Sequence, residues 1–514
     1  MSAPAISAID IEQRPARTGR IQEFGLLVIV FLILELGWFL TDYAFAEDQL
    51  AYTAPAGFTK VSLLGAIVIF GGHFLIRYFA KWADPVIYPS AVLLTGIGFV
   101  VIHRVDFSLI AAGAAGAEVG GQMLLALLGF TAMLVTLGVL RDHRKLRRFT
   151  YISLILGIFL LLLPLVPGIG SQFQGARIWI RVFGFSFQPA EIGKICLVIF
   201  FAGYLVVQRD NLALAGKKIL GLQLPQLRHF APIMVAWIFS LGVLAFENDF
   251  GTALLVFGLF VAMLYIATER ISWIVIGGLL SAVGVWVIVQ LRPHIQARFN
   301  VWLHAFEQDV YDAKGGSYQI VQGWFGMASG GLTGTGLGEG YPTRAYAANS
   351  DMIIASIAEE LGLAGAFAIL VIYLVIIFRA LKTGIHLRDG FGKLLAGGLG
   401  AVLAIQVFLI VGGITRVIPL TGLALPFLAL GGSALLSNWI IIGILLRMSD
   451  DARRPYGTEN KPLSTLSTAD LAPVLGDPEN ATDTGQSREN FTDAFATASE
   501  NDFTDGEKTE VVRL

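Results

Sequence analysis

Residues 249–291, DFGTALLVFGLFVAMLYIATERISWIVIGGLLSAVGVWVIVQL, decide the fold of this chain. They hold two apolar runs, 249–267 and 271–291, with a very short turn between them. Each run has about 20 residues, the length that an α-helix needs to cross a bilayer. Similar runs recur, and we predict about twelve membrane-spanning helices in an all-α polytopic membrane protein. The expected spans are 23–45, 60–80, 84–104, 119–140, 150–167, 188–206, 228–246, 249–267, 271–291, 350–378, 391–413 and 423–447.

The composition supports a membrane protein and excludes several other classes. Of 514 residues, 55% are hydrophobic and only 14% are charged, whereas soluble domains carry about 25% charged residues. The formal net charge of -2 lacks the basic excess of nucleic-acid-binding proteins, so no nucleic-acid partner is expected. Cys196 is the single cysteine, which excludes an internal disulfide and a cysteine-based metal site.

The two ends of the chain differ from the apolar part. Residues 1–22 are expected to form a cytoplasmic N-terminal segment, and 23–449 the membrane domain. Residues 450–514 are polar, acidic and poor in large apolar side chains, so we predict a disordered cytoplasmic tail. The run at 23–45 is longer than the apolar core of a signal peptide, about 7–15 residues, and we interpret it as the first membrane helix.

Basic residues in short loops predict the orientation in the cytoplasmic (inner) membrane. The segments 77–82, 141–149, 207–230 and 379–393 are rich in Lys and Arg, and the predicted spans place all four on one side. Cytoplasmic loops carry such an excess. Both termini are therefore expected in the cytoplasm, and the long loop 292–349 is expected outside.

Two charges fall at the outer end of a predicted span, although ionisable residues there are costly and need a partner or a function. In QPAEIGK (188–194), Glu191 and Lys194 are three residues apart and share one helical face. They either neutralise each other as a structural pair or line a polar cavity beneath the outer surface.

Four further acids lie at or near span ends. Asp249 and Asp351 each precede an apolar run, and we predict that both cap helix N-termini. Glu359 and Glu360 lie deeper in the apolar run 350–378. At least one of them is expected to face the protein interior.

The outer loops also carry five arginines, which are Arg177, Arg181, Arg298, Arg344 and Arg416. Surface arginines are commonly only solvated, but a converging set would suit a pyrophosphate, because guanidinium groups match phosphate oxygens. GGLTGTGLGEG (330–340) fits neither of the common nucleotide-binding glycine patterns. Its glycines are expected to permit tight turns at the membrane surface.

Several segments, in this order, resemble the SEDS family of bacterial cell-wall polymerases, typified by RodA and FtsW. The similar stretches are GARIWIRVFGFSFQPAEIGK, ENDFGTALL, DAKGGSYQIVQGWFGMASGGLTGTGLG, SDMIIASIAEELGLAGA and VIPLTGLALPFLALGGSALLSNWIIIGILLRMSD. The resemblance covers about 170–450 and implies a glycosyltransferase that polymerises lipid II into peptidoglycan strands at the outer membrane face. The family core has about ten spans, so the chain is expected to carry two extra spans at its N-terminal end.

The resemblance also implies functional residues. The family's catalytic aspartate precedes a Gly-Tyr segment by a fixed spacing, which Asp312 satisfies relative to Tyr318, whereas Asp309 does not. Ile178 stands where the family commonly has an arginine, which leaves open which cation meets the phosphates. The implied substrate-binding residues are Arg177, Arg181, Glu191, Lys194, Asp249, Arg298, Tyr318, Gln322 and Arg416.

The chemistry of such a polymerase requires little beyond these groups. A sugar hydroxyl is a poor nucleophile, and a positioned carboxylate that accepts its proton contributes about 10²–10⁴-fold. The leaving pyrophosphate needs charge stabilisation, from arginines or from a divalent cation such as Mg²⁺ or Mn²⁺. No other cofactor is expected, and the sequence does not assign metal ligands.

Alternatives remain open at this stage. Elongation of the cell is the preferred role, with septal synthesis in cell division as the alternative. Many spans with buried charges would also suit a flippase for lipid-linked precursors, or a non-catalytic scaffold. The expected partners are membrane lipids, the lipid II substrate and a single-span class B penicillin-binding transpeptidase, because the chain has no outer domain able to cross-link peptides.

Overall fold

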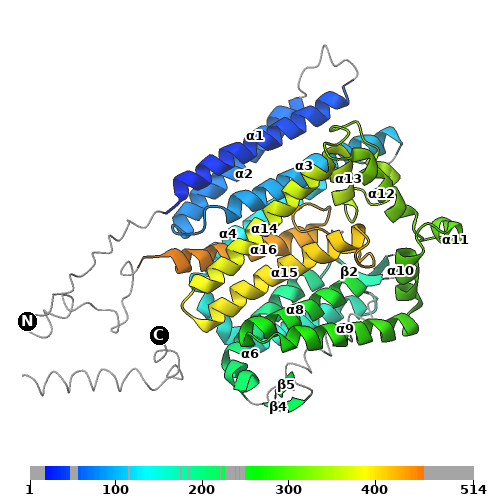
Figure 1. Ribbon diagram of the computed structural model, residues 1–514. Coiled ribbons are helices and arrows are strands. Elements are labelled where there is room, and N and C mark those ends of the chain that lie inside the picture. Colours follow the sequence, from blue (N-terminus) through cyan, green and yellow to red (C-terminus); the bar gives the residue numbers. More distant parts are fainter. Residues whose placement is uncertain are drawn as a thin grey trace, which may run out of the picture. The chain divides into compact units, whose positions relative to one another are not determined.

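A computed structural model describes residues 18–455, except for 47–55, 114–115, 174–175, 183–184, 215, 220–221, 226–237, 239–241 and 243–248 (Figure 1). Among the described residues, eleven helices are long and apolar enough to cross a membrane. The chain is thus a multi-pass, all-helical membrane protein, as the sequence predicts. The span expected at 228–246 lies largely outside the described residues.

The eleven helices pack side by side in one bundle (Figure 1). Their bounds are α1 (Arg20–Ala44), α2 (Ala56–Phe79), α3 (Ile87–Ala111), α4 (Val119–Val139), α5 (Thr150–Leu162), α6 (Ala190–Leu214), α8 (Phe250–Thr268), α9 (Ser272–Leu291), α14 (Gly362–His386), α15 (Gly390–Ile414) and α16 (Gly432–Arg453). The 3₁₀ segments η1 (His143–Phe149) and η2 (Leu163–Leu165) extend α5 at its two ends.

Helices α6, α15 and α16 form the centre of the bundle. In the most apolar stretch of α6 and of α16, 83% of residues are buried, against 17% for α1 and 6% for α9. A helix that is apolar all round can be buried in the core or face lipid, and packing decides between the two. The central helices are therefore the ones able to hold polar groups away from lipid.

Two predicted spans begin later than the sequence indicated. The run 350–378 is broken into α13 (Ile353–Glu360) and α14, because Gly362 takes a φ of 70° that ends the first helix. A Cβ at Gly362 would lie 2.4 Å from the Leu332 carbonyl oxygen and the Gly334 nitrogen. The last span begins at Gly432 instead of 423, after a non-helical segment that contains Pro426.

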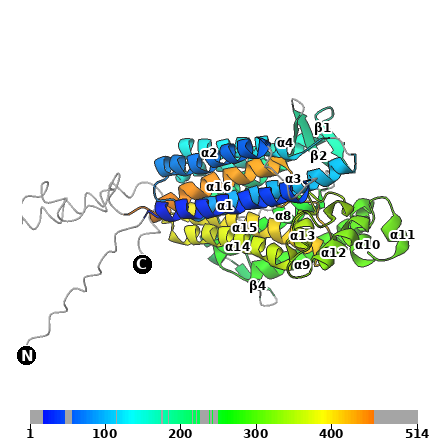
Figure 2. The ribbon, with the colours of Figure 1, turned by 90° about the horizontal axis from the view of Figure 1, so that it is seen from above.

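The segment 292–349, predicted as a loop, is largely helical. It forms α10 (Pro293–Leu303), α11 (Gln308–Asp312), α12 (Tyr318–Gly330) and η3 (Pro342–Arg344). With α13, these helices gather at one end of the bundle (Figures 1 and 2). Pro293 at the first helical position is a start signal that fits the observed beginning of α10.

Two small antiparallel sheets interrupt the helical pattern, and the sequence did not predict them. Strands β1 (Gly170–Phe173), β2 (Ala176–Val182) and β3 (Phe185–Phe187) form one sheet in that order. It lies at the same end as α10 (Figure 2). Strands β4 (Gly216–Ile219) and β5 (Leu222–Pro225) form a hairpin after α6.

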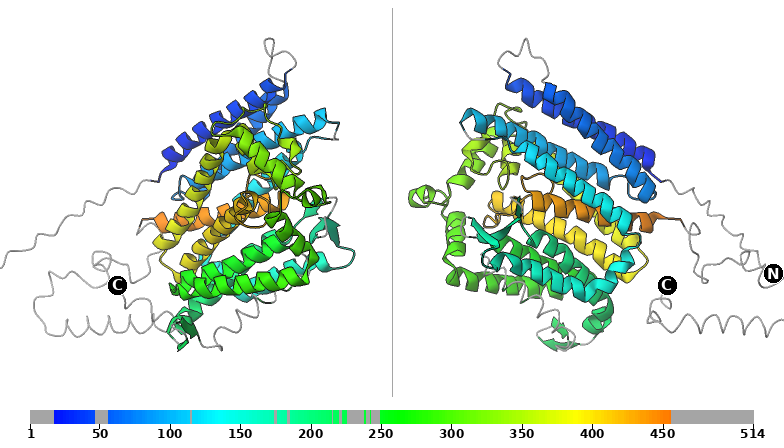
Figure 3. Two further views of the ribbon diagram at one scale, coloured as in Figure 1. Left: turned by 45° about the vertical axis from the view of Figure 1, so that its right-hand side comes forward. Right: turned by 180° about the vertical axis from the view of Figure 1, so that it is seen from behind.

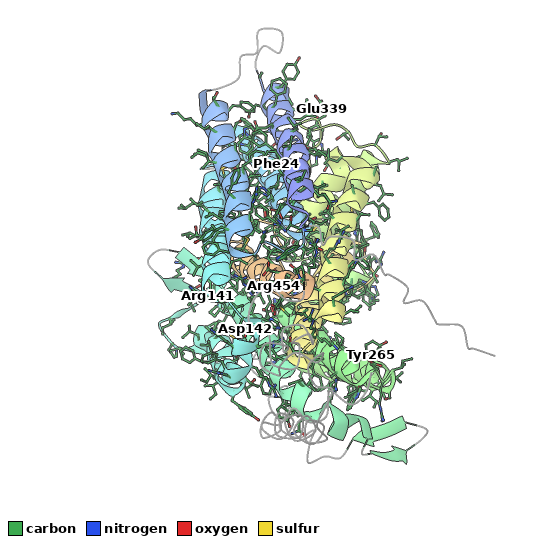
Figure 4. The ribbon with its side chains drawn as sticks, turned by 90° about the vertical axis from the view of Figure 1, so that its left-hand side faces the viewer. Phe24, Arg141, Asp142, Tyr265, Glu339 and Arg454 are labelled. Atoms are coloured by element: carbon green, nitrogen blue, oxygen red, sulfur yellow. The ribbon has the colours of Figure 1, made fainter. Side chains whose placement is uncertain are left out.

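Three of the four basic segments meet at the opposite end of the bundle. The Arg447 guanidinium donates to the Phe79 carbonyl at 2.9 Å and to the Leu137 carbonyl at 2.6 Å. The Asp450 carboxylate accepts from the Trp82 nitrogen at 2.7 Å, and His143 Nε2 lies 2.8 Å from Asp389 Oδ1. Figure 4, which views the bundle from this side, labels Arg141 and Asp142 within one of these segments.

The N-terminal hairpin of α1 and α2 runs along one flank of the bundle (Figure 3). Near one end, Glu23 ion-pairs with Arg20 and lies 2.7 Å from His73 Nδ1. Near the other, Asp42 lies 2.8 Å from His103 Nε2 on α3. Because charges inside a bilayer are costly unless paired, these polar contacts fix the position of the hairpin.

Candidate active site

Asp312, the predicted catalytic residue, is the last residue of α11 and is exposed. Its Oδ2 atom accepts a hydrogen bond from Gln308 Nε2 at 2.6 Å. Val310, on the same short helix, is buried, and its carbonyl accepts from the Ser317 nitrogen at 3.1 Å. The helix is thus anchored on one side while the Asp312 carboxylate stays accessible. Asp309 is also exposed, one turn earlier.

Two aromatic rings and an amide meet at Tyr311, the residue before Asp312. The Tyr311 and Tyr318 rings are 5.3 Å apart between centroids, and Gln322 Nε2 donates to the Tyr311 hydroxyl at 2.8 Å. Tyr311 therefore links two predicted residues, Tyr318 and Gln322, to the short helix that ends at Asp312. Tyr311 was missed, although it adjoins Asp312 in the sequence.

Helices α10 to α12 share a small hydrophobic core of their own. It consists of Ala305, Ile320 and Val321, with Trp324 and Tyr311 packed against it. Ser317 Oγ donates to the Ala305 carbonyl at 2.5 Å, which ties the start of α12 to the end of α10. Asp312 is therefore presented by a packed helical unit.

Arg298 on α10 lies between two acids from other segments. It donates to the carbonyl oxygens of Leu420 at 3.1 Å and Thr421 at 2.8 Å, and its charge acts on Asp249 and Asp351. Asp249 caps α8, as predicted, and accepts from the Thr252 nitrogen at 2.9 Å. Its Oδ2 atom is buried and makes no hydrogen bond.

The N-cap prediction for Asp351 is wrong. Met352 occupies the N-cap position of α13, and no side chain caps this helix. The charge of Arg298 instead acts on Asp351. Burial raises the pKa of Asp351 to about 6, and the nearby guanidinium opposes this shift.

The raised pKa of Asp351 predicts a pH effect on stability. The pKa of Asp351 is about 4 in the unfolded chain and about 6 in the folded protein. The free energy of unfolding therefore falls as the pH rises through this range. We expect Asp351→Asn to stabilise the protein at pH 7–8, with a gain that vanishes near pH 4. Thermal unfolding in detergent across pH measures this, and Asp309→Asn, at an exposed acid, is the control. An Asp351→Asn curve parallel to that of the wild type would contradict the expectation.

Glu191 and Lys194 form a buried pair at the centre of the bundle. Lys194 Nζ lies 2.6 Å from Glu191 Oε2 and 3.0 Å from Gln406 Oε1 on α15. Ser437 Oγ on α16 donates to Glu191 Oε2 at 2.7 Å. The side chains are 7% and 2% exposed, so the predicted pairing is confirmed and each charge has additional partners.

A cavity of about 400 Å³ with both polar and apolar walls lies between α12, the segment 335–345 and the start of α13. Gln322 lines it, and so does Glu359, whose Oε1 atom accepts from the Tyr341 nitrogen at 2.7 Å. Glu359 and Glu360 are both buried, which confirms the expectation for these acids.

Arg104 on α3 holds this side of the cavity in place. Its side chain is almost fully buried, with Nε 2.5 Å from Glu360 Oε1. One of its terminal nitrogens donates to the Gly340 carbonyl at 2.7 Å. The segment 335–345 is thus tied to the membrane helices, and no signal in the sequence indicated Arg104.

The five outer arginines do not gather in one place. Arg298 and Arg416 both join α10 to the segment after α15, since Arg416 donates to the carbonyls of Trp302 at 3.0 Å and Leu303 at 3.1 Å. Arg344 lies over the Tyr341 ring, 4.6 Å from its centroid. Arg177 and Arg181 are exposed on β2.

Side chains suited to hold a metal ion lie at the end of the bundle opposite Asp312. In the described part of the chain, one group of His and acid side chains is close enough to hold an ion: Asp142, His143 and Asp451, at the end opposite Asp312.

The sequence is similar to those of known proteins over most of its length. The model of the FtsW/RodA/SpoVE family, described as cell cycle protein, matches residues 86–454. The peptidoglycan glycosyltransferase RodA of Mycobacterium tuberculosis (strain ATCC 25618 / H37Rv) is 46% identical over 416 residues, covering 79% of this chain and 86% of that protein. A probable peptidoglycan glycosyltransferase FtsW from Geobacter sp. (strain M18) is 32% identical over 375 residues, covering 72% and 97%.

Solved structures share the fold. A chain from a study of how a peptidoglycan synthase complex coordinates polymerization and crosslinking has a TM-score of 0.57 at 21% identity, covering 72% of this chain and 98% of that chain. A mutant of the Thermus thermophilus rod shape determining protein RodA has a TM-score of 0.51 at 20% identity, covering 73% and 99%. The family match begins just before α3, so α1 and α2 precede it, as the two extra spans were predicted to do.

Proposed function

This chain belongs to the FtsW/RodA/SpoVE family, and on that premise we propose that it is a peptidoglycan glycosyltransferase that polymerises lipid II for cell elongation. The observation that carries the proposal is 46% identity to a RodA glycosyltransferase over 86% of that protein's length. The FtsW relative is 32% identical, which favours elongation over septal synthesis.

In the proposed reaction, Asp312 acts as the general base. Its carboxylate accepts the proton of the acceptor hydroxyl while that oxygen bonds to the anomeric carbon of the donor sugar and the lipid pyrophosphate departs. The exposed, anchored position of Asp312 suits this role, because a base must reach the proton it removes. Tyr311, the preceding residue, and its contacts Tyr318 and Gln322 offer ring faces and an amide for orienting sugars.

The departing pyrophosphate requires positive charge near Asp312. Arg298 and Arg416 already bind backbone carbonyl oxygens. We assign Arg177 and Arg181 as the cations for the phosphates, because both are exposed on β2 at the same end of the bundle. A divalent cation bound through pyrophosphate oxygens would supply the same kind of stabilisation.

The proposed orientation places α10 to α13 outside the cell and both termini inside. Three basic segments meet at the end opposite these helices, and short cytoplasmic loops carry an excess of Lys and Arg. Lipid-linked sugars would then reach Asp312 from the outer leaflet.

Incubation of the purified protein with labelled lipid II tests the function. Polymerisation gives a ladder of glycan strands on a gel. A flippase would give no ladder but would move labelled lipid II between the leaflets of a vesicle, and that result would replace the proposal.

We further propose a single-span class B penicillin-binding transpeptidase as the partner. One fold neighbour comes from a complex that couples polymerization to crosslinking, and the described outer segments of this chain contain no domain large enough for a second enzyme. We expect a one-to-one complex in mild detergent that polymerises faster than the protein alone. Recovery of a fully active protein from native membranes without a transpeptidase would contradict this expectation.

A further inference from the structure

The cavity beside α12, which we call the α12 cavity, has the size of a small-ligand site. Its volume is about 400 Å³, within the range of about 300–1,000 Å³ for such pockets. Its walls combine hydroxyl, amide and carboxylate groups with aromatic rings, contributed by Gln322, Phe325, Ser329, Glu339, Tyr341 and Glu359. Phe325 and Tyr341 are 56% and 63% exposed, so their rings are available to a ligand.

Glu359 is built into the wall of this cavity. Glu359 is 6% exposed, and its Oε1 atom accepts a hydrogen bond from the Tyr341 nitrogen. A Cβ on Gly326 would lie 2.6 Å from Glu359 Oε2, so the glycine provides the space that this oxygen occupies. The Thr335 nitrogen donates to the Glu359 carbonyl at 3.0 Å and fixes the adjacent backbone. A buried carboxylate so fixed is preorganised to accept hydrogen bonds.

The charge of the α12 cavity decides which ligand class it suits. It has two carboxylates, Glu339 and Glu359, and one cation, Arg344, so it disfavours a pyrophosphate. Hydroxyl groups can donate to such carboxylates and accept from amides, and the C–H faces of a sugar can pack on exposed aromatic rings. The lining therefore favours a neutral, hydroxyl-rich chain.

Helix α12 connects the cavity to the segment that carries Asp312. Gln322 donates to Tyr311, which adjoins Asp312, and also lines the cavity. Ser329 lies seven residues further on α12, about 10 Å at 1.5 Å per residue. We propose that the α12 cavity binds sugar rings of the growing glycan strand and holds the strand while the next unit is joined at Asp312. This assignment rests on the proposed polymerase function.

Strand length tests the α12 cavity directly. Ser329→Trp places a large side chain in the cavity from an exposed position, and Ala328→Trp places the same side chain on the same exposed helix outside it. With labelled lipid II, we expect Ser329→Trp to make markedly shorter strands while still joining the first units. Ala328→Trp should give strands of wild-type length.

Glu359→Gln provides a second measurement that preserves shape. The amide oxygen can still accept from Tyr341, but the negative charge is lost. Because a hydrogen bond to a charged acceptor is stronger than one to a neutral amide, we expect about tenfold weaker binding of an uncharged N-acetylglucosamine tetramer to the full-length protein, measured by calorimetry.

The outcomes separate this inference from the proposed function. A wild-type protein that makes no strands from lipid II would defeat the polymerase proposal. A wild-type protein that makes strands, with Ser329→Trp strands equally long, would defeat the cavity assignment alone. The cavity assignment would also fail if Glu359→Gln and the wild type bound the tetramer equally. It would fail as well if the wild type bound the stem peptide and not the tetramer.

Discussion

Asp312→Asn is expected to abolish strand synthesis from lipid II and to leave folding and membrane insertion intact. Asparagine has a similar shape but cannot take up the proton of the acceptor hydroxyl. Loss of a general base costs about 10²–10⁴-fold in rate. The Asp312 side chain is exposed at the end of α11 and makes a single hydrogen bond, to Gln308, so stability should hardly change. Strand formation on gels and thermal unfolding in detergent measure the two effects.

Asp309 supplies the matched control, because it is an exposed aspartate on the same short helix. Asp309→Asn should keep most of the wild-type rate. The opposite pattern, with Asp309 essential and Asp312 dispensable, would show that the spacing to Tyr318 identifies the wrong carboxylate.

The second large effect concerns the buried pair of Glu191 and Lys194. Removing one partner leaves an uncompensated buried charge, which costs about 3–5 kcal/mol. We expect Glu191→Ala and Lys194→Ala each to lower the free energy of unfolding by about 3–5 kcal/mol. Unfolding in mixed detergent micelles measures this change. Activity should fall together with stability, because the two helices that partner the pair, α15 and α16, lie at the centre of the bundle.

A charge swap, Glu191→Lys with Lys194→Glu, should rescue the single variants only in part. It restores the ion pair, but the bonds from Ser437 to Glu191 and from Lys194 to Gln406 are specific to each position. His304 and Glu307 are the control, since they form an exposed pair with the same three-residue spacing. Glu307→Ala should change stability by at most about 1 kcal/mol. Equal stability of all variants would show that the central pair is incidental.

The helices and the pairing could be predicted because they depend on local periodicity. Apolar runs of about 20 residues indicate spans, and charges three apart share a helical face. The break at Gly362 could not be predicted, because its cause is the close approach of a segment about thirty residues earlier.

The site was predictable only in part. Asp312, Tyr318 and Gln322 belong to one sequence segment, and Tyr311 contacts Tyr318 and Gln322. Arg104 contacts Glu360 from 256 residues away in the chain. Asp351 precedes an apolar run like a capping residue, yet the charge of Arg298 on another helix acts on it. Tertiary contacts of this kind leave no trace in local spacing.

The bonds from α16 to the C-terminal ends of α2 and α4 and to the loop after α2 have a consequence for biosynthesis. The Phe79 and Leu137 carbonyls and the Trp82 nitrogen receive partners from Arg447 and Asp450, which the ribosome adds 310 to 368 residues later. Until then, these earlier backbone groups must keep water or other partners. The bundle therefore closes at this end only when the final helix arrives, and a nascent chain cut short before α16 would expose open loops to membrane quality-control proteases.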